Sequence, residues 1–381
     1  MSGANSHRLT LERLVIAADV LAPADREEAA ALIAEPAHEH FWLSGQGTGA
    51  ALLPQPGMGA TQICTGRLNR IVEYEPADLT VTVEAGCQLG VLQEALGAAG
   101  QFLPVDYPAS GTVGGLVATA AAGPRALGYG SIRERLLGVT AITPEGQLVR
   151  SGSRVVKSVS GFDLHRLYCG SFGTLVLIVE ATFKLAPLPA RHETLGFVGS
   201  RSLIAEFAGA LLGSQLRPTS LVATGGARSD DGQIVVVIEG GAARVQRLDQ
   251  EIRTLAVRLA LQPDSPPNAI AKEATAGPCL TLQVSAAAAR DAFLSPPFPG
   301  EVMADFGTGQ VVLQLESAPE ERNLSALKAQ LQPGDSLSYS AEGNTLRRRR
   351  LEPGTRELAR RIKQALDPND RLNRGLLETL L

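Results

Sequence analysis

The sequence is poor in aromatic side chains and has no excess of positive charge. Its 381 residues include 10 Phe, 5 Tyr and 1 Trp, too few for the stacked aromatic platforms that bind single-stranded nucleic acid. Lys and Arg together number 35 against 39 Asp and Glu, which gives a net charge of −4. No global basic field therefore attracts a phosphate backbone, and nucleic acid is not an expected partner.

Cysteines are few, and long apolar runs are missing. The four cysteines form no CxxC pair and lack the spacings of zinc sites and iron–sulfur clusters; they are Cys64, Cys87, Cys169 and Cys279. We therefore expect no metal and no iron–sulfur cluster in this chain. The longest aliphatic run has five residues, as in Leu175–Val179, whereas a membrane span needs about 20. With no apolar signal core at the start, a cytoplasmic protein without a transmembrane segment is expected.

Glycine and proline are instead abundant, with 40 and 23 residues. That is too many for a helical bundle and too irregular for collagen, so many tight turns and loops are expected. Hydrophobic residues make up 44% of the chain and charged residues 19%, a balance typical of globular proteins. Because 381 residues exceed one ordinary core, we expect two domains.

The first part of the chain predicts strands and helices that lead into a glycine-rich turn. Asp25 is predicted to cap a helix that ends near Glu35, with Glu28 three residues after the cap. A short strand at 41–43 runs directly into the turn at 44–49. Residues 79–84 alternate apolar and polar side chains, as in a half-buried strand. A helix is predicted next from its leucine spacing, with Leu89, Leu92 and Leu96.

Later segments predict a boundary near residue 189. A hairpin is expected around Pro144–Gly146, and a strand over 175–185 ends at Pro187-Leu188-Pro189. New alternations follow at 233–239 and 310–316, with helical patterns between them. The expected units are a domain over 1–189, a smaller α+β domain over 190–345, and a basic helical segment over 346–381.

The C-terminal segment differs in composition from the rest. Residues 346–374 carry ten basic and four acidic side chains, a net charge of +6. Part of it predicts an amphipathic helix with a basic outer face, marked by Leu358, Ile362 and Leu366. Two interpretations stay open: a docking surface for an acidic patch, and a solvated helix face.

Three glycine-rich segments follow predicted strands, namely Ser44–Gly49, Ser110–Gly115 and Gly170–Thr174. Successive glycines expose backbone N–H groups, which suit a phosphate-bearing ligand. Each segment alone is more often a simple turn, but the three together favour a diphosphate. None of them matches GxGxxG at the start of a helix or GxxxxGK[ST], so Rossmann and P-loop sites are not expected.

An ordered set of motifs carries a family resemblance. It comprises Glu84-Ala85-Gly86, Ser110–Leu116, Gly123-Pro124-Arg125, Leu127–Gly130, Val155–Leu164 and Gly170–Leu175. Over about 40–190 the chain resembles the FAD-binding domain of the vanillyl-alcohol oxidase/PCMH flavoprotein superfamily, and within it the FAD-binding subunits of bacterial glycolate oxidases. Weaker echoes lie at 304–307 and 367–375. Three departures are Ser44-Gly45-Gln46-Gly47, where relatives usually have Arg-Gly-Gly-Gly, Val176, where a glycine is common, and Arg374, which interrupts the closing Asn-Pro-Gly pattern.

The resemblance implies an α+β architecture: a PCMH-type two-subdomain FAD-binding fold followed by a smaller α+β cap domain. It implies FAD as cofactor, held without a covalent bond because the first loop offers no histidine. The cofactor-binding residues that it implies are Gly45, Gly47, Thr48, Gly49, Ser110, Gly111, Thr112, Gly114, Gly115, Thr119, Gly128, Tyr129, Gly130, Ser131 and Gly173. Lys157 and Asp163 fall in a matching block, and each fits a structural ion pair or cap equally well. No catalytic residue and no metal ligand are assigned.

The function that the resemblance implies is that of an FAD-binding redox subunit of a multi-subunit glycolate (2-hydroxy acid) oxidase. Its expected partners are a catalytic FAD subunit and an iron–sulfur subunit, through which peripheral membrane association is possible. Two alternatives are an assembly scaffold with weak or no FAD and a self-sufficient FAD-dependent hydroxy-acid dehydrogenase. The last ranks lowest, because the family's catalytic members carry histidines in the second domain and this chain has none after His192. His165 is expected to be a packed or capping residue.

Overall fold

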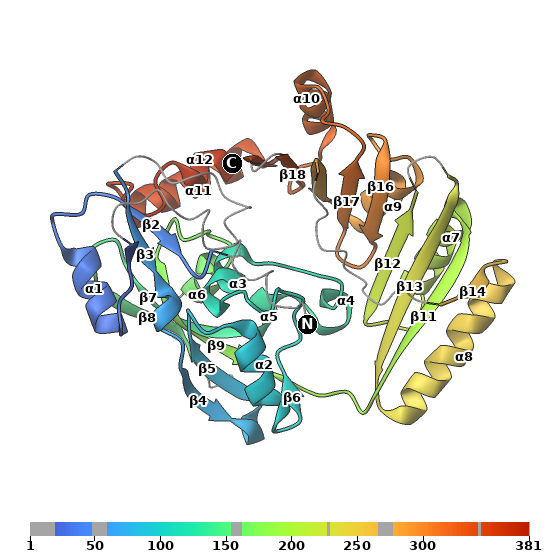
Figure 1. The fold of residues 1–381 in the computed structure, drawn as a ribbon, viewed down its shortest axis with the longest axis horizontal. Helices are drawn as coiled ribbons and strands as arrows, with labels where there is room; N and C mark the ends of the chain where they lie inside the picture. The colour runs from blue at the N-terminus through green and yellow to red at the C-terminus, as the bar shows by residue number, and fades with distance from the viewer. Residues whose placement is uncertain are drawn as a thin grey trace, which may run out of the picture.

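The computed structural model describes residues 20–47, 59–153, 162–226, 229–265, 277–341 and 344–380. Helices and sheets are mixed, and the chain forms two lobes (Figure 1). The first lobe contains residues 20–187 and returns at 353–380, and the second contains residues 191–349. Each lobe has hydrophobic clusters of its own.

A five-stranded antiparallel sheet forms the centre of the first lobe, in the order β4-β5-β9-β7-β8. Its strands are β4 (Ile71–Glu75), β5 (Thr80–Glu84), β7 (Leu136–Ile142), β8 (Leu148–Gly152) and β9 (Leu177–Lys184). Side chains of β5 and β9 pack with those of α2 (Leu89–Gly97) and α3 (Val113–Thr119) in one buried cluster. The strands expected at 79–84 and 175–185, the 144–146 hairpin and the leucine-spaced helix are therefore confirmed. Leu79 has a φ of 56°, which is why the strand begins at Thr80.

A small parallel sheet lies beside it, in the order β1-β3-β2. Its strands are β1 (Val20–Leu21), β2 (Phe41–Ser44) and β3 (Thr61–Cys64). Helix α1 (Arg26–Ala34) precedes β2, and the Asp25 side chain accepts a hydrogen bond from the Glu28 amide at 2.8 Å. The predicted cap, helix and strand are thus confirmed. Strand β2 ends where the first glycine-rich segment begins, so this sheet sets the position of that segment.

Short elements connect the main parts of the first lobe. They are η2 (Thr65–Arg67), η3 (Pro76–Asp78), β6 (Gln101–Phe102), α4 (Ala126–Tyr129), α5 (Ile132–Arg135), α6 (Leu164–Tyr168) and β10 (Ala186–Pro187). Strand β10 pairs antiparallel with β6 just before the chain enters the second lobe.

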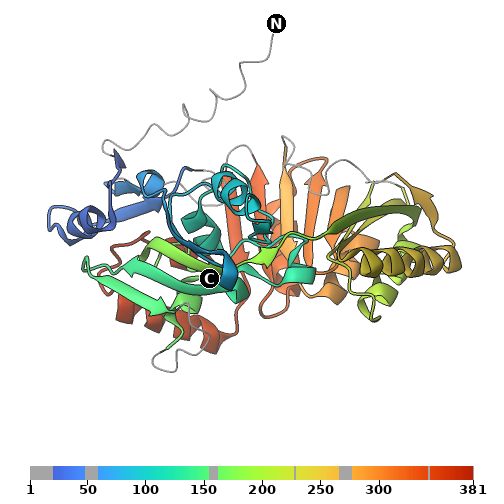
Figure 2. The ribbon, with the colours of Figure 1, turned by 90° about the horizontal axis from the view of Figure 1, so that it is seen from below.

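The second lobe is built on one antiparallel sheet of nine strands, in the order β14-β11-β13-β12-β16-β17-β15-β18-β19. The strands are β11 (Arg191–Ser200), β12 (Ser220–Gly225), β13 (Asp231–Gly240), β14 (Gln262–Asp264), β15 (Cys279–Gln283), β16 (Gly300–Asp305), β17 (Gln310–Leu315), β18 (Ser336–Ala341) and β19 (Asn344–Arg349). Its helices are α7 (Arg201–Leu212), α8 (Ala242–Arg258), α9 (Ala286–Leu294) and α10 (Glu321–Gln330). Side chains of α7, α8 and α9 form one cluster with alternate residues of the strands, and Figure 2 shows α8 across this face.

The C-terminal segment departs from its prediction. Residues 344–349, which we divided between the second domain and a helical segment, form β19 and pair with β18. Helix α11 (Pro353–Leu366) begins only at Pro353, because a proline suits the first helical turn and forces the preceding residue to be extended. Its Ile362 and Leu366 pack against the first lobe, whereas Leu358 is 54% exposed. A last helix, α12 (Leu376–Leu380), follows.

Within the described ranges, no helix combines the length and apolar character that crossing a membrane requires.

Close backbone contact at Gly86 generates the first testable expectation. A Cβ built on Gly86 would lie 1.9 Å from the carbonyl oxygen of Thr65, so Gly86→Ala forces two backbone segments apart and lowers the free energy of unfolding by about 1–3 kcal/mol. Gly97 is the matched control: its added Cβ meets nothing within 4 Å at the end of α2, and Gly97→Ala is neutral or stabilises by up to about 1 kcal/mol. Urea unfolding of both variants measures this, and equal effects contradict the packing argument.

Candidate functional site

The three glycine-rich segments meet around helix α3. A Cβ on Gly45 would lie 2.3 Å from Thr112 Oγ1, so the first segment abuts the start of α3. The amides of Gly170 and Phe172 donate to the carbonyl oxygens of Val117 and Ala118 at 3.0 and 2.8 Å. The third segment therefore packs against the C-terminal end of the same helix. In the sequence the first and third segments lie about 120 residues apart, and the fold brings all three together.

Two glycines of the second segment, Gly111 and Gly114, are required by close contacts within the chain. The Gly114 amide donates to the Ala85 carbonyl at 2.7 Å, and a Cβ on Gly114 would lie 2.9 Å from Ala85 Cβ. The amides of Gly111 and Gly115 donate to the Pro108 carbonyl at 2.8 Å and to Thr112 Oγ1 at 3.2 Å. We expected these amides to point toward a diphosphate. The structure instead engages them within the chain, because α3 lies directly against the segment that follows β5.

One face of α3 is nevertheless open. Val113, Leu116 and Val117 are fully buried, while the opposite face, which carries Gly114, Gly115, Ala118 and Thr119, is half-exposed. No side chain of α3 on this face is larger than threonine, and the Tyr107 ring lies beside it: a Cβ on Gly111 would be 2.4 Å from Tyr107 Cε1, and a Cβ on Gly115 3.0 Å from Tyr107 Oη. Small half-exposed residues bordered by an aromatic ring suit a flat ligand, and in this respect the residues fit FAD. We call residues 110–119 the small-residue strip.

The predicted residues 128–131 lie where the two lobes meet. The Gly128 amide donates to the Thr219 carbonyl at 3.2 Å, and a Cβ on Gly128 would lie 2.8 Å from Thr219 Cα. The Tyr129 ring packs edge-on against Phe102 at 5.4 Å. Burial, with a smaller contribution from the Glu239 carboxylate, raises the pKa of the Tyr129 hydroxyl to about 12. Ser131 donates through its amide and hydroxyl to Glu134 Oε2 at 2.6 and 3.0 Å, which caps α5. Gly128 and Tyr129 thus contact the second lobe, whereas Gly130 and Ser131 lie against Glu134 of the first.

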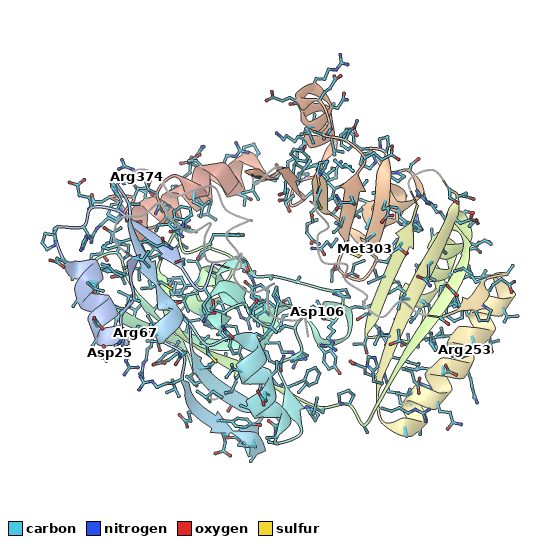
Figure 3. The ribbon with its side chains drawn as sticks, in the orientation of Figure 1. Asp25, Arg67, Asp106, Arg253, Met303 and Arg374 are labelled. Carbon is cyan, nitrogen blue, oxygen red and sulfur yellow. The ribbon has the colours of Figure 1, made fainter. Side chains whose placement is uncertain are left out.

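The seam between the lobes also contains acidic groups that sequence reasoning missed. Burial raises the pKa of Asp106, whose Oδ2 accepts the Arg125 amide at 2.7 Å (Figure 3). Burial also raises the pKa of Asp305, at the end of β16. Glu239 Oε1 lies 2.9 Å from His192 Nδ1, and among the described residues its buried Oε2 has no hydrogen-bond partner. Only Asp305 had a signal in the sequence, as part of the weak 304–307 motif.

The remaining predicted residues divide into three groups. Gly47 has a φ of 77° and Gly173 a φ of 68°, which suits glycine in a tight turn. Asp163 is 68% exposed and lies 3.8 Å from Arg166, as in the ion-pair alternative. Three predicted residues lie outside the described residues: Thr48, Gly49 and Lys157. Among the residues that are described, no three His, Cys, Asp or Glu side chains are grouped as in a metal site.

His165 is a packed residue of the first lobe. It is 5% exposed, its amide donates to Ser151 Oγ at 2.9 Å, and its Nδ1 lies 3.3 Å from the same oxygen. Burial lowers the pKa of the imidazole. The ring therefore links helix α6 to strand β8, which agrees with a structural role.

The lowered pKa of His165 predicts a pH dependence of stability. The unfolded chain binds the proton more readily than the folded chain, so stability falls as the pH drops below about 6.5. His165→Gln removes this group and is expected to flatten the decline of the melting temperature between pH 7.5 and pH 5. Thermal melts of both proteins across this range are the measurement. If the melting temperature falls equally with pH in both proteins, His165 does not titrate in this way.

Comparisons with known proteins point to the same cofactor. The family model described as FAD binding domain matches residues 17–152. The chain is 36% identical to glycolate oxidase subunit GlcE of Escherichia coli (strain K12) over 183 residues, which is 46% of this chain and 49% of that protein. It is 32% identical to glycolate oxidase subunit GlcD of Bacillus subtilis (strain 168) over 181 residues, 46% of this chain and 38% of that protein.

One further relative and one solved structure show how much of the chain the similarity covers. D-2-hydroxyglutarate dehydrogenase of Xanthomonas citri pv. viticola is 36% identical over 148 residues, 38% of this chain and 31% of that protein. The matched stretches thus span half or less of each of these curated relatives. A solved structure of alkyldihydroxyacetonephosphate synthase superposes with a TM-score of 0.67 at 17% identity, covering 93% of this chain and 75% of that one. This likeness concerns the fold of both lobes. Residues 17–152 therefore match an FAD binding domain, and the chain is similar to glycolate oxidase subunits over nearly half of its length.

Proposed function

We propose that this chain is an FAD-binding redox subunit of a multi-subunit glycolate, or 2-hydroxy acid, oxidase in the cytoplasm. Its partners in this proposal are a catalytic FAD subunit and an iron–sulfur subunit. Bound without a covalent link, FAD would supply a two-electron acceptor that passes electrons on to a partner. The proposed domain division is a FAD-binding domain over 1–189 and a cap over 190–345, with the C-terminal segment returning to the first.

The observation that carries this proposal is the chemistry of the second lobe. Its six central strands, β13, β12, β16, β17, β15 and β18, contain no His, Lys or Arg. The face turned away from the helices carries amides, hydroxyls and aliphatic groups instead, among them Thr224, Met303, Gln310 and Thr281. A general base for a 2-hydroxy acid is usually an imidazole, and a carboxylate is usually held by Arg. These six strands provide neither, and the imidazole of His192, on the neighbouring strand β11, lies 2.9 Å from the Glu239 carboxylate. This favours a subunit that handles electrons rather than substrate.

The small-residue strip is the proposed surface for the cofactor. Gly45 lies at one end of it, beside Thr112, and the turn around Gly173 lies at the other. The half-exposed residues of the strip are small and Tyr107 lies beside Gly115, so the chain's own residues would orient a flat ligand through backbone groups, small polar groups and this ring. Ser110 and Thr119 carry the accessible hydroxyl groups of this surface, whereas Thr112 is buried and caps α3. Gly111, Gly114, Gly128, Tyr129, Gly130 and Ser131 form its supports and its border with the second lobe.

Substitution of Gly115 tests the strip. A Cβ at this position would meet only the ends of two side chains, Tyr107 Oη at 3.0 Å and Thr112 Oγ1 at 3.2 Å, so Gly115→Val keeps the fold while covering the strip. We expect FAD per chain to fall at least tenfold. Gly114→Val is the contrast, because its side chain meets Ala85 and destabilises the protein with or without flavin. Flavin absorbance of the purified proteins measures the effect. Wild-type FAD content in a folded Gly115→Val protein contradicts this assignment.

The function itself is tested by anaerobic reduction. The purified chain is expected to retain FAD that acid releases intact, and glycolate or D-lactate added alone is expected not to bleach its absorbance. Bleaching is expected once the co-expressed catalytic subunit is present. Rapid bleaching of the isolated chain would establish a self-sufficient dehydrogenase instead. Purified chain without flavin, in a complex that still turns over, would establish the scaffold alternative.

A further inference from the structure

The C-terminal segment extends the small parallel sheet of the first lobe. The Phe41 amide donates to the Arg371 carbonyl at 2.7 Å, and the Asn373 amide donates to the Phe41 carbonyl at 2.9 Å. Leu372 thereby pairs with Phe41 in a parallel bridge. Residues 371–373 lie beside β2 although more than 300 residues separate them in the chain. The strand that leads into the first glycine-rich segment is thus held by the end of the protein.

The side chain of Asn373 connects two glycine-rich segments directly. Its Oδ1 accepts the Leu43 amide at 2.7 Å, and its Nδ2 donates to the Phe172 carbonyl at 2.7 Å. Leu43 lies two residues before Gly45, and Phe172 precedes Gly173. Asn373 is 1% exposed, so both bonds are shielded from water. One carboxamide therefore spans the first and third segments with its acceptor and its donor both in use.

A buried ion pair holds the other end of the third segment. Lys363 Nζ donates to the Thr174 carbonyl at 2.8 Å and lies 2.5 Å from Asp367 Oδ2. Lys363 is 8% exposed and Asp367 2%. Asp367 also accepts the amides of Arg371 and Leu372, each at 2.9 Å. The lysine of α11 and the asparagine beyond it therefore hold both ends of the turn at 172–174.

This turn needs external support. Phe172 and Gly173 have φ values of 54° and 68°, a pair of left-handed residues of which one is not glycine. Such a conformation costs free energy for a residue with a side chain and persists only where its surroundings fix it. The bond from Asn373 fixes the Phe172 carbonyl, and a Cβ on Gly173 would lie 2.8 Å from Asn373 Nδ2. The position of the turn relative to the first segment thus follows from this contact.

We propose that Asn373, with Lys363 behind it, is a positioning residue for FAD: it sets the spacing between the first and third glycine-rich segments, so that the C-terminal segment controls flavin affinity. This inference rests on the proposed function, because it requires that the chain bind FAD. Neither side chain is placed in contact with the cofactor. Both act through the backbone of Leu43 and of residues 172–174.

Three variants test this proposal in the full-length chain. Asn373→Asp keeps the shape and the acceptor for the Leu43 amide but loses the donor to Phe172. Lys363→Met keeps an aliphatic chain but loses the bond to Thr174. Arg360→Gln is the control on the same helix, because Arg360 pairs only with the exposed Glu378 among the described residues. The Kd for FAD is measured by flavin fluorescence at 10 °C, with the visible circular dichroism of bound flavin and the melting temperature of the apoprotein.

We expect Asn373→Asp and Lys363→Met to raise the Kd at least tenfold and to alter the visible dichroism, while Arg360→Gln matches wild type. The dichroism reports the geometry around the flavin, which a loss of stability alone does not change. Should one variant fail to fold, the other carries the test. Folded variants with lowered melting temperatures but wild-type Kd and dichroism overturn the inference and leave the proposed function intact. Wild-type protein that binds no FAD overturns both.

Discussion

Close contact between backbone segments at glycine positions is the constraint on which the first lobe depends. At Gly45, Gly86 and Gly114, an added Cβ would lie 2.3, 1.9 and 2.9 Å from atoms of other segments. The chain can bring β2, the end of β5 and α3 together only because these side chains are missing. The same packing favours small side chains on the half-exposed face of α3, which Tyr107 borders. Glycines such as Gly114 therefore serve the fold directly, and the surface proposed for a flat ligand is a consequence of that packing.

The order of elements makes this surface depend on the whole chain. The second lobe lies in sequence between β9 and α11, and only after it does the chain return to pair Leu372 with Phe41. Lys363 and Asp367 are buried as an ion pair that also satisfies backbone groups, which is the arrangement that offsets the cost of removing charges from water. Without residues 353–373, the carbonyls of Thr174 and Phe172 and the amide of Leu43 would lose these hydrogen-bond partners, which is costly for buried polar groups. Folding of both lobes and formation of the surface are thereby coupled.

Local patterns predicted the elements of the first lobe well, and contacts between distant segments less well. Asp25, the alternation at 79–84 and the Pro144–Gly146 hairpin each carry a signal within a few residues, and the structure confirms them. The strip was predicted as a region, but its amides were expected to face a ligand; no local pattern reveals that the Gly114 amide bonds to Ala85. Asp106 and Glu239 gave no signal, because their burial arises only when the lobes meet. Asn373 lies within the weak 367–375 motif, but nothing in that motif indicates that its side chain bonds to Leu43 and Phe172.

The electrostatics of the seam bear on the proposed division of roles. Asp106 and Asp305 come from different lobes, and burial raises the pKa of both carboxyl groups, with a further contribution from Asp106 to the raised pKa of Asp305. The described strands nearest to them, β12, β16 and β17, supply no cation, and Arg125 Nε lies 3.9 Å from Asp106 Oδ1. Burial at this seam therefore disfavours negative charge. An anionic substrate would lose hydration on entering it, whereas electrons can be transferred without placing an anion there, which agrees with the proposed division of roles.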